Sequence, residues 1–296
     1  MPELTHLKIS DTSIADLAPL AGASGLKRLI CVNTAIKDLA PLAGLKQLEQ
    51  LDFYDTAVAD LAPLAGLAGL RELWCGYSWV TDLRPLAGLT GLRLLWCGGL
   101  AIADLKTLVG LTELESLNCD DMPITDLEPL HALTALRRLR CFRTNVTTLD
   151  PIRYLIALRE LTCGRTKIAD LGPISTLRNL RSLDCGGTSV TDLRPLAELQ
   201  DLEWLRIIRT DVSDLGPLAG LGALRGLSCD ETLVSDLSPL RGLSKLESLS
   251  CIRTSVSDLR PLVGLPALKH VNYRGCPVAM IPAGLPMGDN VRFQEP

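Results

Sequence analysis

The sequence predicts a solenoid of the α/β class, with short parallel strands on one side and short helical or 3-10 turns on the other. Three observations lead to this fold class: a strict internal period, alternating apolar residues in one part of each period, and an Asp and a Pro at fixed places in another. A constant period of about 20 to 50 residues is the signature of repeat architectures, in which each unit packs on its neighbours.

The period is 22 residues, and it runs through the chain without an insertion. Within each unit the pattern is L-x-x-L-x-C-x-x-T-x-V-x-D-L-x-P-L-x-x-L-x-x. This regularity predicts a single domain over 1–296, with thirteen units from Leu4 onward. The last unit departs from the pattern after Val278, and we expect it to be a C-terminal cap. The first-position leucines stand at 4, 26, 48, 70, 92, 114, 136, 158, 180, 202, 224, 246 and 268.

Each half of the unit predicts one element. The segment L-x-x-L-x-C predicts a short strand with one buried face, because its apolar residues alternate at its end. Asp follows at the thirteenth position in eleven of the first twelve units, with Thr148 the exception, and Pro at the sixteenth, with Thr107 the exception. Asp caps a helical or 3-10 turn, and Pro is tolerated in a first turn. The second half is therefore predicted to be a turn.

The pattern resembles the leucine-rich repeat family, specifically the bacterial, internalin-like and SDS22-like class with 22-residue units. The resemblance covers residues 4 to about 285. It implies a curved solenoid whose parallel sheet lies on the concave face, where partners usually bind, with the turns on the convex face. Two positions depart from the family pattern. The ninth, often Asn, is mostly Thr in this chain, and the sixth, commonly Leu, is mostly Cys.

Nine of the ten cysteines occupy the sixth position, and Cys276 occupies the ninth. Because other units hold Ile9, Phe53 or Ile207 at the sixth position, we expect these thiols to point into the core, where Cys behaves as a small hydrophobe. A linear ladder of cysteines cannot converge on a zinc ion. Free buried thiols favour a reducing compartment. The sequence thus predicts structural cysteines, no metal site and no cofactor.

Composition and motifs exclude several function classes. The formal net charge of −4 argues against a general nucleic-acid binder. No apolar run is long enough to insert in a membrane. The start, MPELTHLKIS, shows no secretory signal, so we expect a cytoplasmic protein or an effector translocated by another route. No phosphate-binding loop or nucleophile elbow is present, and the chain is not expected to be an enzyme.

The variable positions predict a binding surface. Unit positions three, five, seven, eight and ten hold seven of the eleven aromatic residues, although the core is built from Leu and Cys. Exposed Trp and Tyr are enriched in binding hot spots. Acidic and basic residues follow the aromatic cluster along the chain, as in a docking surface. The predicted partner-binding residues are Tyr54, Trp74, Tyr77, Trp79, Trp96, Asp120, Asp121, Arg138, Arg140, Phe142, Arg143, Arg165, Trp204, Arg206 and Arg209.

The hypothesis that follows is a non-catalytic scaffold that recognises a protein partner through its concave face. It would be a regulator, an immunity-type inhibitor or the recognition arm of a larger protein. Two alternatives remain open from the sequence: a carbohydrate-binding or host-receptor-binding module of internalin type, and the substrate-recognition part of an effector enzyme.

Overall fold

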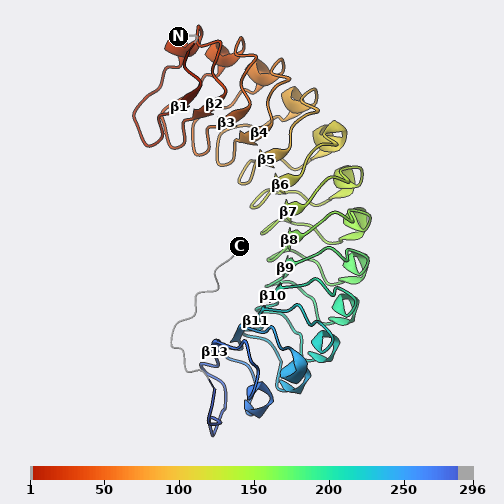
Figure 1. Cartoon of the computed structure of the whole chain (residues 1–296). Helices are drawn as coiled ribbons and strands as arrows, with labels where there is room; N and C mark the ends of the chain where they lie inside the picture. Colours follow the sequence, from red (N-terminus) through yellow and green to blue (C-terminus); the bar gives the residue numbers. More distant parts are fainter. Residues whose placement is uncertain (1–2, 286–296) are drawn as a thin grey trace. The chain divides into compact units, whose positions relative to one another are not determined.

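A computed structural model describes residues 3–285 of the chain, which fall into two compact units, 3–145 and 146–285. In each unit the strands lie on one side and the turns on the other (Figure 1). The described part of the first unit contains seven parallel strands: β1 (His6–Lys8), β2 (Arg28–Ile30), β3 (Gln50–Asp52), β4 (Glu72–Trp74), β5 (Leu94–Trp96), β6 (Ser116–Asn118) and β7 (Arg138–Arg140). The described part of the second contains six: β8 (Glu160–Thr162), β9 (Ser182–Asp184), β10 (Trp204–Arg206), β11 (Gly226–Ser228), β12 (Ser248–Ser250) and β13 (His270–Asn272).

Strands within a unit pair in chain order, and their register keeps equivalent residues side by side. Leu73 lies opposite Leu95, and Trp74 opposite Trp96, so the offset between β4 and β5 is one sequence period. In a parallel sheet, side chains that share a register point to the same face. The leucine-rich repeat solenoid predicted from the sequence is therefore the observed fold.

All helical elements among residues 3–285 are 3-10 turns. In the first unit they are η1 (Ala18–Leu20), η2 (Ala40–Leu42), η3 (Ala62–Leu64), η4 (Arg84–Leu86), η5 (Lys106–Gly110) and η6 (Glu128–Leu130). In the second they are η7 (Asp150–Ile152), η8 (Gly172–Ile174), η9 (Arg194–Leu196), η10 (Gly216–Leu218), η11 (Ser238–Gly242) and η12 (Arg260–Leu262). No helical element among residues 3–285 is long and apolar enough to cross a bilayer.

The thirteenth-position Asp caps each turn, as predicted. Asp16 Oδ1 accepts a hydrogen bond from the Ala18 N–H at 2.7 Å, and the ten other thirteenth-position aspartates make the same bond two residues ahead. In the repeat that has Thr148 in place of this Asp, the Thr148 hydroxyl accepts a hydrogen bond from the Asp150 N–H at 3.1 Å. The cap satisfies a backbone donor that the short turn leaves without a partner.

The core is a stack of Leu, Ile, Val and Cys side chains. All nine sixth-position cysteines are buried, as predicted, whereas Cys276 is half-buried. The structure explains why the ninth position is mostly Thr. The Thr34 hydroxyl donates to the Cys31 carbonyl at 2.7 Å, and the other eight ninth-position threonines donate to the carbonyl of the sixth residue of their own repeat in the same way. A hydroxyl at this place satisfies a buried acceptor that an aliphatic side chain would leave unpaired.

The predicted C-terminal cap is described only in part. Leu265 and Val271 are still buried, but Met280 is 81% exposed and Ile281 is also exposed. Residues 286–296 lie outside the described residues, so closure of the core by the last unit stays a prediction.

Candidate functional site

An aromatic hollow lies on the strand side of the first unit. Trp74 and Trp96 stand next to each other on β4 and β5, as predicted, because both occupy the fifth position of their 22-residue repeats. Trp74 is half-buried, and Trp96 is 37% exposed. The hollow has a volume of about 600 Å³ and is open to solvent. Its lining residues are Val32, Asp52, Tyr54, Trp74, Tyr77, Trp96, Gly98, Asn118, Asp120, Asp121, Arg140 and Phe142.

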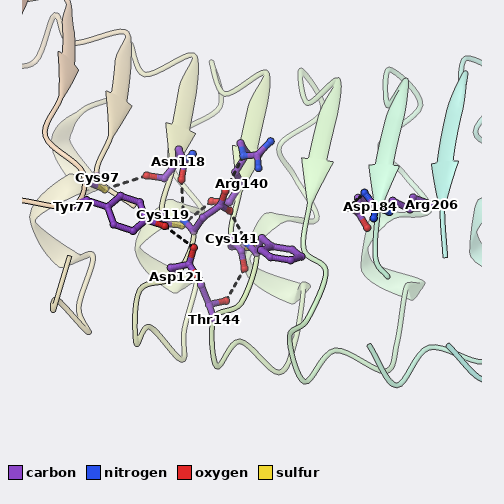
Figure 2. A network of polar contacts seen from close by, with 12 residues as sticks. Tyr77, Cys97, Asn118, Cys119, Asp121, Arg140, Cys141, Thr144, Asp184 and Arg206 are labelled. Atoms are coloured by element: carbon purple, nitrogen blue, oxygen red, sulfur yellow. Dashed lines mark hydrogen bonds and ion pairs between the residues drawn. The ribbon is translucent and has the colours of Figure 1, made fainter. Parts of the chain in front are cut away.

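Two tyrosines form the side of the hollow that follows the strand ends. The rings of Tyr54 and Tyr77 are tilted by 53°, with centroids 5.3 Å apart, which is within the range of favourable aromatic pairs. The Tyr77 hydroxyl donates to Asp121 Oδ2 at 2.8 Å (Figure 2). This bond raises the pKa of Tyr77 to about 12, because the nearby carboxylate disfavours the phenolate.

Glycines make the space for these rings. The Tyr77 ring lies across Gly99, where an added Cβ would approach ring atom Cδ1 to 2.8 Å. A Cβ at Gly98, which lines the hollow, would lie 2.9 Å from Asn118 Oδ1, and one at Gly76 would lie 2.7 Å from the Gly98 carbonyl oxygen. At either glycine, even a methyl side chain would not fit without a shift of its neighbours. Gly76, Gly98 and Gly99 were not among the predicted site residues. The glycines that follow Cys75 and Cys97 in the sequence could have indicated them.

Two carboxylates, Asp120 and Asp121, also line the hollow. Asp120 accepts from Arg140 Nε at 2.8 Å and from the Phe142 N–H at 2.7 Å. Burial raises the pKa of Asp120, and Arg140 opposes this effect. Asp121 accepts from Tyr77 and forms an ion pair with Arg143 at 3.1 Å. Each of these two carboxylates thus has its own arginine.

Asp52, on β3 beside Trp74, differs from that pair. Its Oδ1 accepts from the Tyr54 N–H at 3.1 Å, and among the described residues its side chain has no ion pair within 4.0 Å. Burial raises the pKa of Asp52, while the Tyr54 N–H and the more distant Arg28 act in the opposite direction. Asp52 is half-buried and faces the aromatic side of the hollow.

Of the remaining predicted residues of the first unit, Trp79 and Arg138 lie outside the hollow, whereas Phe142 lines it. Trp79 is 66% exposed and does not line it, and Arg138 is exposed on β7. Phe142 is half-buried in the hollow wall. The structure therefore brings together Trp74, Trp96 and the two tyrosines, and it leaves Trp79 apart from them.

The predicted residues of the second unit serve different packing roles. The Trp204 ring lies over Gly226, where an added Cβ would be only 2.3 Å from its Cε3 and Cζ3 atoms. Arg206 pairs with Asp184 at 3.8 Å, and Arg209 with Glu231 at 3.1 Å. Arg165 is exposed. Arg206 and Arg209 are thus neutralised by acids of neighbouring repeats.

In each 22-residue repeat, the residue at the eighth position adopts a left-handed backbone conformation, which was not predicted from the sequence. Its N–H continues the strand ladder: the Tyr77 N–H donates to the Gly98 carbonyl at 2.9 Å. Asn, Asp and Gly tolerate this region, whereas other residues are strained by about 1–2 kcal/mol. The residues with positive φ at this position are Asp11, Asn33, Asp55, Tyr77, Gly99, Asp121, Arg143, Arg165, Gly187, Arg209, Glu231, Arg253 and Gly275.

Thiol and metal chemistry finds little support in the described residues. Burial raises the pKa of Cys31, Cys97 and Cys141 to about 12, so these thiols remain protonated near neutral pH. No group of three or more His, Cys, Asp or Glu side chains among residues 3–285 is arranged to hold a metal ion.

Comparison with known proteins identifies the fold family. No protein-family model and no curated protein sequence matches the chain. Among solved structures, an internalin (InlF) from Listeria monocytogenes matches with a TM-score of 0.81 and 25% identity, over 92% of this chain and 87% of that one. The InlJ domain from the same organism, described as including a cysteine ladder, matches with a TM-score of 0.72 and 24% identity, over 95% of this chain and 56% of that one. The Leptospira interrogans LRR protein LIC12759 matches with a TM-score of 0.75 and 17% identity, over 94% and 80%. The chain is a leucine-rich repeat protein whose fold is similar to that of bacterial internalins.

Proposed function

We propose that this protein is a non-catalytic scaffold that binds a protein partner through the strand side of its first unit, with the aromatic hollow as the anchoring site. The observation that carries the proposal is the pair Trp74 and Trp96, which stand side by side on β4 and β5 and line the hollow. The leucine and cysteine core does not need these rings. Apolar surface of this kind is costly to expose unless it serves an interaction.

The surroundings of the tryptophans fit a docking surface. Hot spots are aromatic residues in a central pocket, surrounded by polar groups that contribute less energy. Here the ion pairs Asp120–Arg140 and Asp121–Arg143 border the aromatic rings. Arg138, exposed on β7, would add a charge at the rim. Rim charges act mainly on the association rate and its salt dependence.

The cellular setting belongs to the same proposal. Nine buried free thiols support a reducing compartment, such as the cytoplasm, either of the producing cell or of a cell into which the protein is delivered. In such a setting the scaffold would act as a regulator, an immunity-type inhibitor or the recognition arm of a larger protein.

The test is affinity capture from a lysate with the wild-type protein, followed by titration calorimetry with the captured partner. Replacing Trp74 and Trp96 together by Ala should weaken binding by several kcal/mol, because central aromatic anchors often contribute about 2 kcal/mol or more each. The melting temperature should change little, since the core lies on the other side of the strands. Trp79→Ala is the matched control, because it removes an exposed indole outside the hollow. Normal binding by the double variant, or a loss equal to that of Trp79→Ala, would refute the proposal.

A further inference from the structure

We infer that the group which the aromatic hollow receives is an arginine side chain of the partner, stacked on Trp74 and paired with Asp52. The inference rests on the proposed function and specifies the chemistry of its anchoring site.

The charge balance of the hollow favours a cation. Asp120 and Asp121 are each matched by an arginine of β7 or of the turn that follows it, at 2.8 and 3.1 Å. Asp52 has no such partner within ion-pair distance in the described chain, and Arg28 acts on it only from farther away. The hollow thus holds one carboxylate charge more than it neutralises. An acidic side chain of a partner would meet three carboxylates, whereas a basic one would complete the set.

Partial burial of Asp52 makes this imbalance energetically significant. A half-buried carboxylate has lost part of its hydration, and this loss raises its pKa. A cation at hydrogen-bond distance returns the lost solvation, and a charge-assisted hydrogen bond is about twice as strong as a neutral one. Oδ1 already accepts the Tyr54 N–H, so Oδ2 is the oxygen available to a ligand.

The aromatic walls add a second preference for a cation, and for a planar one. Trp74 is the β4 residue directly opposite Asp52, and Trp96 follows on β5. The faces of indole rings attract cations, and guanidinium stacks on them more often than ammonium does. A planar guanidinium can therefore lie on Trp74 while it donates to Asp52, and its aliphatic stem can cover Trp96.

A local structural role does not explain the charge of Asp52. In other repeats the fifth-position side chain also accepts a hydrogen bond from the backbone N–H two residues later. Asn118 does so with its amide oxygen, at 2.9 Å. Asn272 also does so, at 3.3 Å. An amide is thus sufficient for the turn, and the negative charge remains to be accounted for. Asp52→Asn is for this reason a clean variant, because it keeps the acceptor and removes the charge.

The experiment uses the full chain labelled with nitrogen-15 at tryptophan, whose four indole N–H signals are assigned by single Trp→Phe variants. The probes are capped Gly-Arg-Gly, Gly-citrulline-Gly and Gly-Lys-Gly peptides at millimolar concentration. The Arg peptide should shift the Trp74 and Trp96 signals in a saturable way and leave the Trp204 signal in place. The neutral citrulline peptide, and Asp52→Asn with the Arg peptide, should bind at least about fivefold more weakly. Asp184→Asn, at the equivalent position of the second unit, should leave the affinity unchanged.

Equal binding of the citrulline peptide, or an unchanged affinity in Asp52→Asn, would overturn the inference. So would equal or tighter binding of the lysine peptide, because it would assign the site to ammonium. An absence of shifts with every peptide would also overturn it. Failure of the proposed function gives a different result: the Arg peptide would bind normally while the Trp74 and Trp96 double replacement left partner capture intact.

Discussion

At the scale of single residues, the residue at the eighth position of each repeat determines the backbone conformation just after the strand. Tyr77 has a φ of 51°, a conformation that is unfavourable for a bulky residue. In this conformation its ring passes over Gly99 and reaches Asp121, two repeats ahead. The tyrosine thus accepts local backbone strain and gains an aromatic contact and a hydrogen bond, both of which shape the hollow.

The bond between Tyr77 and Asp121 predicts a tyrosine that titrates late. With tyrosines labelled at Cζ, the NMR signal of Tyr77 should report a pKa of about 12, above the ordinary value of 10. Because the folded-state pKa is raised, this group contributes stability that is fully present below pH 10 and is lost as the pH rises through about 12. Asp121→Asn removes the carboxylate charge, and the pKa should then return toward its ordinary value. Ionisation of Tyr77 at the ordinary value in the wild-type protein would contradict the bond.

At the scale of elements, each strand and turn is held by bonds that repeat with the sequence period. The thirteenth-position Asp caps the turn, and the ninth-position hydroxyl closes the bend after the strand. The sixth-position thiols fill the core below the strands, and several lie near a carbonyl of the next repeat, as with Cys119 Sγ, 3.0 Å from the Arg140 oxygen. Small, weakly polar thiols suit this place because they pack like hydrophobes beside a backbone acceptor.

Burial of the thiol ladder predicts two classes of cysteine reactivity. The nine sixth-position thiols should resist an aromatic disulfide reagent at neutral pH, because they are buried, and burial also raises the pKa of thiols such as Cys97. Cys276 is half-buried, and hydrogen bonding with the Cys251 thiol and Thr254 lowers its pKa, so it should react first. Absorbance at the reagent's product band should therefore show one fast equivalent and nine that appear on unfolding. The fast phase should vanish in Cys276→Ser, and rapid labelling of several ladder thiols would contradict burial.

At the scale of the whole molecule, stability is built from contacts between neighbouring repeats. Within each unit, strands and turns contact those of the adjacent repeats in the chain. Ion pairs reinforce the same order along the second unit, where Arg225 lies between Glu203 and Glu247, at 3.5 and 3.0 Å. Exposed pairs add little stability each, but opposite charges at equivalent positions of adjacent repeats disfavour a shifted register.

Nearest-neighbour stacking predicts that the 22-residue repeat is the module that can be removed. Deletion of residues 224–245 removes β11 and η11 and leaves β10 in register with β12, so the product should fold cooperatively. Deletion of residues 224–234 alone would remove β11 and leave η10 followed by η11 with no strand between them, and this product should not fold. Circular dichroism and thermal unfolding would compare the two. If both deletion variants melted alike, the repeat would not be the structural module.

The sequence by itself determined the fold and the placement of its main aromatic pair. A constant period fixes the register of parallel strands, and a fixed register places equivalent positions side by side, as seen for Trp74 and Trp96. Only the tertiary structure decided how side chains use that placement. Tyr77 reaches Asp121 because Gly99 leaves space, and Trp204 lies flat on Gly226 for the same reason. The pairing of Arg140 with Asp120 depends on distances across strands, which periodicity does not encode. The period specifies backbone neighbours, whereas volume and charge in three dimensions select the contacts that make the site.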